Sequence, residues 1–224
     1  MTAATYRVLH QDEQVLVVSK AAGVLTVARP GSRERCLLDD LRADGLAVAP
    51  VHRLDKDTSG VLLLNLDRSV RSDLELLFRK RQVEKTYLAL VRGKPQSRKA
   101  VIDVPILDQG RTARVDRSGK RAVTRYETLE SWGAAASLLR VQMETGRHNQ
   151  IRVHMAHLGH PLLGDDKFGR RERGSRRSDM PHARRAMLHA EKLAFVHPAT
   201  NKRLEVSCQP PSDFAAVIEA LRKT

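Results

Sequence analysis

The sequence predicts an α+β fold, with a mixed, mainly antiparallel sheet flanked by helices and loops. More segments alternate between apolar and polar residues, as strands do, than repeat at helical spacing. Several of these segments are adjacent and joined by short connections, which favours antiparallel pairing. No internal repeat or clear linker divides the 224 residues, so we expect a single domain, 1–224, large enough for a sizeable core.

The N-terminal third is predicted to contain strands and two helices. Residues 6–20 have the pattern of a hairpin, and residues 36–43 are predicted to form a short helix. The apolar run 61–66 has the length of a buried strand. Apolar residues within 70–78 then recur at helical spacing, which predicts an amphipathic helix of roughly three turns.

The middle of the chain is predicted to continue mainly as strands. Residues 83–91 alternate, which places Tyr87 on one face and Leu88 on the other. Two further alternating runs, 123–129 and 138–143, flank a turn-like segment.

The C-terminal part is predicted to hold two helices and two strands. Apolar spacing over 151–158 indicates a helix that ends at Gly159. Residues 188–196 and 204–208 return to the strand pattern, and Ser212 is predicted to cap a last helix.

Charge is the strongest compositional clue to a partner. Forty Lys and Arg against 26 Asp and Glu give a formal net charge of +14 and an isoelectric point near 10.4. Such a basic surface indicates a polyanion, most often nucleic acid. The alternative is a solvated cationic surface without a specific partner. An anionic membrane surface is less favoured, because no basic amphipathic helix stands out.

Composition also excludes several classes of protein. No apolar stretch is long enough to span a membrane, and the N-terminus lacks an apolar signal core, so we expect a cytoplasmic protein. Neither Cys36 nor Cys208 belongs to a CxxC pair, so a zinc knuckle is unsupported. Cys208 is interpreted as a buried strand residue.

An arginine-rich segment, 168–185, is predicted to be a mobile loop within the domain, because it holds few apolar residues. We favour a loop that contacts phosphates and becomes ordered on RNA; the alternative is an insertion with no specific role. The arginines predicted to bind RNA are Arg170, Arg171, Arg173, Arg176 and Arg177.

The most informative stretch is 52–60, which reads His-Arg-Leu-Asp-Lys-Asp-Thr-Ser-Gly. It places Asp55 beside Arg53 on a loop that leads directly into the predicted buried strand. An acid on a loop fixed by a rigid strand is a plausible nucleophile or base. The residues alone are equally consistent with a turn that carries a surface ion pair.

A second polar stretch, 145–154, reads Thr-Gly-Arg-His-Asn-Gln-Ile-Arg-Val-His. Its polar side chains crowd the start of a predicted helix, where Arg147 and His148 are suited to hold a phosphate. A metal site on His154, His157 and His160 is disfavoured, because no acidic ligand is near them. These histidines are expected to pack or to contact RNA.

Both stretches resemble motifs of the RluA-type pseudouridine synthases. Residues 52–60 are similar to the family signature, and 145–154 are similar to its second motif, usually Thr-Gly-Arg-x-His-Gln-Ile-Arg. His148 is displaced by one position from the expected histidine. Further matches lie, in family order, at residues 20–23, 84–93, 159–165 and 188–190.

The resemblance implies an RNA pseudouridine synthase with the family's catalytic fold. Asp55 would be catalytic, Tyr87 the active-site tyrosine, and Arg152 the partner that keeps Asp55 ionised. The target uridine would flip out of its stack. The remaining residues expected to bind RNA are His52, Arg53, Thr58, Arg147, His148 and Gln150.

The same resemblance implies the partners. We expect a structured RNA, a stem-loop of rRNA or tRNA, with no cofactor and no metal, because the isomerisation involves no redox change. We also expect a monomer without a separate N-terminal RNA-binding domain.

Two other classes of function remain open. A non-catalytic RNA-binding protein that kept the fold would not need Asp55, Tyr87 and Arg152 intact. A metal-dependent nuclease would use Asp55, Asp57 and the histidines, and it would be sensitive to a chelator.

Overall fold

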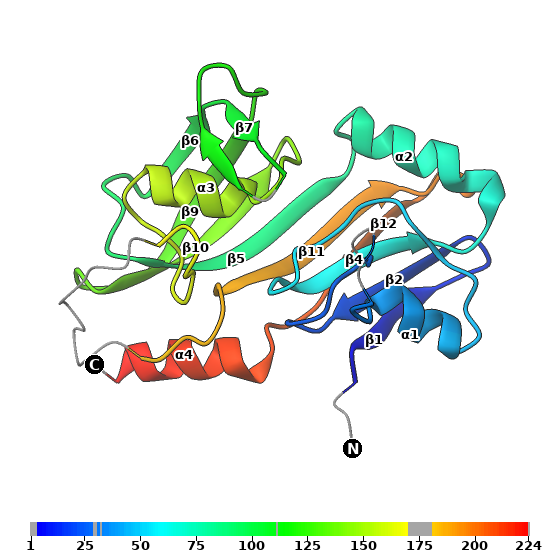
Figure 1. Ribbon diagram of the computed structural model, residues 1–224, viewed down its shortest axis with the longest axis horizontal. Coiled ribbons are helices and arrows are strands. Elements are labelled where there is room, and N and C mark those ends of the chain that lie inside the picture. Colours follow the sequence, from blue (N-terminus) through cyan, green and yellow to red (C-terminus); the bar gives the residue numbers. More distant parts are fainter. Residues whose placement is uncertain (1–3, 29–30, 32, 111, 170–180, 224) are drawn as a thin grey trace. The chain divides into compact units, whose positions relative to one another are not determined.

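The computed structural model describes residues 4–28, 31, 33–110, 112–169 and 181–223. The chain forms two compact units: a first unit of Met1–Lys85 with His189–Pro210, and a second unit of Thr86–Leu188 with Pro211–Thr224. The described residues contain four α-helices and mostly antiparallel strands (Figure 1). This confirms the predicted α+β class, whereas the single domain 1–224 stays a prediction.

The sheet of the first unit is antiparallel except at one pair of strands. Its spatial order is β1-β2-β4-β11, with β12 paired to β11 and β3 paired to β4. The parallel pair is β4 with β11. The strands are β1 (Tyr6–Gln11), β2 (Val15–Lys20), β3 (Ala49–Pro50), β4 (Ser59–Asn65), β11 (Leu188–Val196) and β12 (Arg203–Ser207).

Three helical segments belong to the first unit, namely α1 (Leu37–Ala43), the 3-10 turn η1 (Arg68–Val70) and α2 (Arg71–Arg79). Leu74 of α2 packs into a core with Val17, Leu63 and Phe195 from the sheet. Every residue of β4 is buried, which confirms that the apolar run after Gly60 is an interior strand. Cys208 is also buried in this core, as predicted, but it follows the last residue of β12 and is not part of the strand.

Gly60 lies where β4 meets β11 most closely. Its φ is +116°, and a Cβ at this position would lie 2.2 Å from the carbonyl oxygen of Ala190. Only a residue without a side chain permits this approach of two backbones. A glycine at position 60 of β4 is therefore a requirement of this close parallel pairing.

The sheet of the second unit is antiparallel, in the order β5-β10-β9-β6, and a separate hairpin joins β7 to β8. β5 begins with two residues of the first unit. The strands are β5 (Glu84–Arg92), β6 (Lys99–Asp103), β7 (Ile106–Asp108), β8 (Ala113–Val115), β9 (Val123–Trp132) and β10 (Ala136–Met143). The helices are α3 (Gln150–His157) and α4 (Ser212–Arg222).

Helix α4 covers the second unit's sheet and runs alongside β5 and β10 (Figure 1). Its Phe214 and Val217 pack against Leu88 of β5, which confirms the predicted facing of that strand. The cap of α4 differs from the prediction. Ser212 is the first helical residue, and Pro211 occupies the N-cap without a side-chain hydrogen bond.

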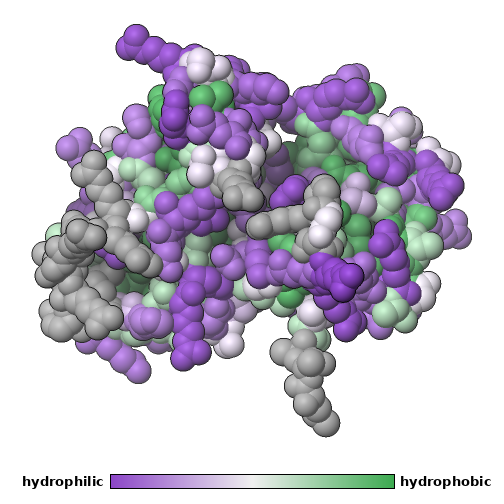
Figure 2. Space-filling view, viewed as in Figure 1, coloured by the Kyte–Doolittle hydropathy of each residue, from purple (hydrophilic) through white to green (hydrophobic). Residues whose placement is uncertain are grey.

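Figure 2 shows many hydrophilic side chains on the surface of the described residues. Among the described residues, none of the helices combines the length and the apolar character that crossing a membrane requires.

Candidate active site

Residues 51–58, the Asp55 loop, lead directly into β4, as predicted. Asp55 is half-buried, and Arg53 and Lys56 are exposed. The N–H of Thr58 donates to the carbonyl of Asp55 at 3.1 Å and closes a turn. Among the described residues of the first unit, none hydrogen-bonds or ion-pairs with the Asp55 carboxylate. Thr58 itself is buried, which points away from the RNA contact predicted for it.

The main chain of the Asp55 loop is anchored on both sides of the aspartate. The hydroxyl of Thr26 accepts from the N–H of Leu54 at 3.2 Å and donates to its carbonyl at 2.9 Å. The buried ammonium of Lys20 donates to the carbonyl of Lys56 at 3.2 Å. Sequence reasoning singled out Lys20 only as part of a motif and missed Thr26.

His52 has a structural role within the first unit. Its Nε2 accepts from the backbone N–H of Leu63 at 3.0 Å, in the stretch of β4 between its pairings with β3 and β11. The ring stacks on Phe78, with centroids 4.6 Å apart. Burial, and secondarily the charge of Lys85, lowers the pKa of His52 to about 3. This geometry points away from the RNA contact predicted for His52.

Tyr87 lies in β5 of the second unit, where it is buried and aligned opposite Val141 of β10. The strand and the residue's face agree with the sequence prediction. Its role beside Asp55 would join residues from different units, so that role stays a prediction.

Arg152 projects from α3 and forms a bidentate ion pair that the sequence did not predict. Its Nε and Nη2 each donate to the Asp165 carboxylate at 2.7 Å, and its Nη1 donates to Asn149 Oδ1 at 3.0 Å. The guanidinium also lies 5.0 Å from the centre of the Phe168 ring. The ion pair expected between Arg152 and Asp55 would join the two units and stays a prediction.

Gln150 is buried and its amide is saturated with protein partners. Its Nε2 donates to the carbonyl of Val123 and to the hydroxyl of Thr124, both at 2.9 Å. Its Oε1 accepts from the Thr145 hydroxyl at 2.7 Å and from the Arg147 N–H at 3.0 Å. An amide has two donors and two lone pairs, so no capacity remains. We therefore interpret Gln150 as a structural residue, in place of the predicted RNA contact.

Two half-exposed side chains connect the start of α3 to the hairpin region of the second unit. Arg147 Nε donates to the carbonyl of Arg121 at 3.1 Å, and His148 Nδ1 lies 3.2 Å from Asp108 Oδ1. The N–H of Gly110, and then His148, lower the pKa of the Asp108 carboxyl. The displaced His148 thus faces a carboxylate of β7.

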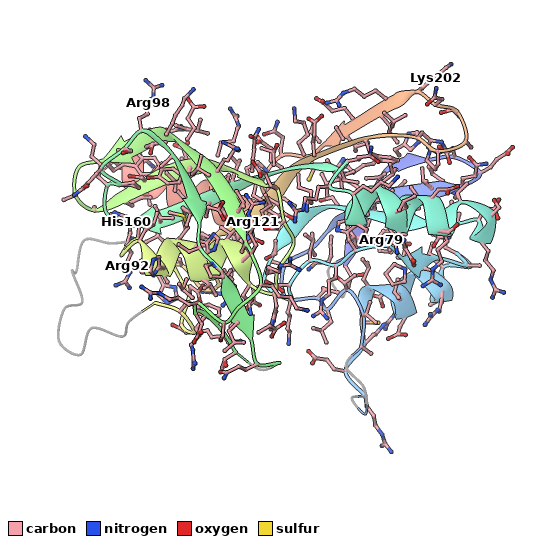
Figure 3. The ribbon with its side chains drawn as sticks, turned by 90° about the horizontal axis from the view of Figure 1, so that it is seen from above. Arg79, Arg92, Arg98, Arg121, His160 and Lys202 are labelled. Atoms are coloured by element: carbon pink, nitrogen blue, oxygen red, sulfur yellow. The ribbon has the colours of Figure 1, made fainter. Side chains whose placement is uncertain are left out.

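Two other histidines of this region, His154 and His160, have different hydrogen-bond partners. His154 is buried between the Thr124 hydroxyl, at 2.9 Å, and the Val104 carbonyl, at 3.1 Å. His160 lies beside Arg92 at the end of β5, with Nδ1 2.9 Å from the Arg92 carbonyl oxygen (Figure 3). Within the described ranges, no group of three or more His, Cys, Asp and Glu is placed to hold a metal ion.

The predicted arginine-rich loop is only partly described. Arg185, at its end, is buried and forms a bidentate pair with Asp213 of α4, so this end is fixed rather than mobile. The arginines predicted to bind RNA lie outside the described residues; they are Arg170, Arg171, Arg173, Arg176 and Arg177.

Comparison with known proteins identifies the family. The family model for RNA pseudouridylate synthases matches residues 14–157. The chain is 36% identical over 227 residues to an uncharacterized RNA pseudouridine synthase of Mycobacterium bovis, which covers 96% of this chain and 72% of that protein. It is 36% identical over 223 residues to ribosomal large subunit pseudouridine synthase C of Salmonella typhi, covering 96% and 70%.

Solved structures agree with these sequence matches. The human RNA pseudouridylate synthase domain containing 4 superposes with a TM-score of 0.78 at 29% identity, covering 96% of this chain and 92% of that chain. The human domain containing 1 superposes with a TM-score of 0.75 at 29% identity, covering 98% and 95%. The chain therefore belongs to the RNA pseudouridylate synthase family, and to its RluA-type branch.

Proposed function

We propose that this RNA pseudouridine synthase isomerises specific uridines of ribosomal RNA, with Asp55 as its catalytic carboxylate. The proposal rests on the geometry of the Asp55 loop. Lys20 and Thr26 anchor the main chain of the loop on both sides of the aspartate. Described residues of the first unit leave the Asp55 carboxylate unengaged. Relatives named for the large ribosomal subunit support rRNA as the substrate. A tRNA stem-loop is the alternative substrate.

The reaction fits carboxylate chemistry. The bond from the ribose C1′ to uracil N1 breaks, the base turns, and C1′ bonds to C5; the C5 proton leaves and N1 gains a proton. An aspartate can add to the sugar or the base, or remove a sugar proton, and each route is carboxylate catalysis. The balance involves no redox change and requires no added group.

The target uridine must leave its stack to reach a carboxylate, which costs a few kcal/mol. Tyr87 is proposed to stack on the flipped base, because aromatic faces bind unstacked bases well. Arg152 is proposed to act with Asp55 by keeping that carboxylate ionised.

The charge of the chain supports an RNA substrate. The net charge of +14 includes exposed cations on both units. Figure 3 shows Arg79 of α2 in the first unit, and Arg98 and Arg121 in the second. Such cations contribute a salt-dependent attraction to phosphates that is independent of sequence. We also propose that the enzyme works in the cytoplasm and as a monomer.

The test is tritium release from RNA labelled at uracil C5, measured in EDTA for wild type and Asp55→Asn. We expect release by wild type and none by Asp55→Asn, because the amide cannot act as nucleophile or base. The RNA affinity of Asp55→Asn is expected to stay within a few fold of that of wild type. Asp57→Asn removes the same charge two residues away and serves as the matched control.

The arms of this experiment separate the competing functions. Full activity of Asp55→Asn would overturn the catalytic assignment. Release from tRNA and not from rRNA would replace the substrate. A non-catalytic binding protein predicts no release from either RNA, and a metal-dependent nuclease predicts strand cleavage that EDTA abolishes and that depends on Asp57.

A further inference from the structure

The segment 20–26 lies along the Asp55 loop and hydrogen-bonds to the residue on each side of the aspartate. Thr26 is 2% exposed, and its single hydroxyl both accepts from Leu54 N–H and donates to Leu54 C=O. Leu54 lies outside the strands, so its buried backbone groups need a partner other than a strand ladder. Thr26 supplies that partner for both groups.

The residue after Asp55 is anchored by the same segment. The carbonyl of Lys56 accepts from Gly23 N–H at 2.9 Å and from the Lys20 ammonium at 3.2 Å. The same ammonium donates to the carbonyl of Val24 at 2.8 Å, so it also stabilises the turn that the segment forms. The residues before and after the aspartate are therefore both tied to residues 20–26 through their backbone groups.

We propose that Thr26 is a positioning residue for catalysis, which holds Asp55 in its reactive position through the main chain of Leu54. This inference rests on the proposed function of Asp55. No described residue of the first unit holds the carboxylate directly, so within that unit its direction follows from the backbone that carries it. A misplacement of about 1 Å in a reacting group can cost on the order of a hundredfold in rate.

Valine is close in shape to threonine but lacks the hydroxyl. Thr26→Val would leave Leu54 N–H and C=O buried without their partner, and the loop would move to find water or another bond. Thr26→Ser keeps the hydroxyl and loses only a methyl group. A positioning role through the hydrogen bonds therefore predicts that valine impairs turnover and serine restores it.

The experiment measures kcat and KM by tritium release for Thr26→Val and Thr26→Ser, together with the melting temperature of each protein. Thr5→Val is the matched control, because Thr5 also belongs to the first unit and its hydroxyl donates to Asp40 Oδ2 at 2.6 Å. We expect Thr26→Val to lower kcat by roughly 10- to 100-fold with little change in KM. We expect kcat of Thr26→Ser and Thr5→Val to stay within about threefold of wild type.

Two results would overturn the inference. One is a wild-type kcat for Thr26→Val, and the other is an equal loss for the serine variant, which would assign the effect to packing. If Thr26→Val does not fold, Thr26→Ala assayed at lower temperature gives the same comparison with serine. Asp55→Asn in the same assay keeps the two proposals apart. An active Asp55→Asn contradicts the proposed function, whereas an inactive Asp55→Asn with a fully active Thr26→Val contradicts only the positioning role.

Discussion

The two units hold their proposed catalytic residues in different ways. In the first unit, neutral hydrogen bonds and one buried ammonium anchor the main chain beside Asp55, and the described residues of that unit leave its carboxylate unengaged. In the second unit, the Arg152 guanidinium is itself bound, through two bonds to a carboxylate that is fully buried. Under the proposed function, the group that reacts would be positioned through its backbone, and the group that presents a charge would be oriented through its side chain.

This difference predicts where each unit is most sensitive to substitution. The first unit should depend on close backbone geometry around the Asp55 loop and β4. The second should depend on the pairing of buried charges. Three pairs of substitutions test this contrast, in addition to those at Asp55 and Thr26.

The largest effect is expected at Gly60. Gly60→Ala would place a Cβ 2.2 Å from the Ala190 carbonyl oxygen, so β4 and β11 would have to separate. We expect a loss of several kcal/mol of stability or no folded protein, because the atoms of Ala190 that the added Cβ would meet are all backbone atoms. Gly45→Ala is the control, since Gly45 also has a positive φ, of +83°, but has nothing within 4 Å of an added Cβ.

Urea unfolding of both variants measures this prediction, and hydrogen exchange locates the effect. A cost for Gly45→Ala of about 1–2 kcal/mol is expected from its backbone conformation alone. Equal costs for the two alanine variants would show that the close approach contributes nothing. Loss of protection in both units would support the predicted single domain 1–224, while loss confined to the first unit would contradict it.

Sequence reasoning predicted the parts of the fold that have a local signal. The apolar run of β4 is continuous and fully buried, and the Asp55 loop was placed correctly at its start. β6, β7 and β8 were missed because they are short and partly exposed, as Val101 shows at 51% exposure. A short strand at the edge of a sheet carries little periodicity for a sequence to display.

The partners of the candidate site were harder to predict than its residues. Thr26 lies 28 positions from Leu54, and Asp165 lies 13 positions from Arg152. Neither pair has a fixed spacing that would mark it, because each contact is created by the tertiary fold. Motifs locate groups that react, whereas the groups that hold them become visible only when the chain is folded.

The second largest effect is expected at Asp165. Asp165→Asn removes the countercharge of Arg152, and the two side chains are 0% and 11% exposed. Breaking a buried pair on one side costs about 3–5 kcal/mol, because the remaining charge loses its bidentate partner in a buried site. The expected result is a matching loss in the free energy of unfolding, measured in urea.

A surface pair of the same unit provides the control for this substitution. Glu144 pairs with Arg125, but these side chains are 36% and 52% exposed. Glu144→Gln should therefore cost no more than about 1 kcal/mol. Similar losses for Asp165→Asn and Glu144→Gln would mean that burial of the Arg152 pair has no energetic consequence.

The smallest effect is expected in the pH dependence of stability. It concerns one neutral imidazole in each unit, that of His52 and that of His154. His52 accepts a backbone N–H, and His154 bridges a hydroxyl and a carbonyl. Burial lowers the pKa of both rings, to about 3 for His52. An unfolded histidine has a pKa near 6.5, so below this pH the unfolded chain binds more protons than the folded one. Stability is therefore expected to fall as the pH drops from about 6.5 toward 3.

Replacing His52 by glutamine isolates the contribution of this ring to the pH dependence of stability. The glutamine oxygen can accept from Leu63 N–H but does not titrate, so the variant should lose less stability than wild type between pH 7 and pH 5. One fully depressed histidine accounts for about 2 kcal/mol over this interval. Urea unfolding at the two pH values measures the difference. The same measurement on His154→Gln gives the contribution of His154, in the second unit, to the pH dependence of stability. An unchanged pH dependence in His52→Gln would show that this ring titrates alike in the folded and unfolded protein, and that its bond to β4 is not the one described.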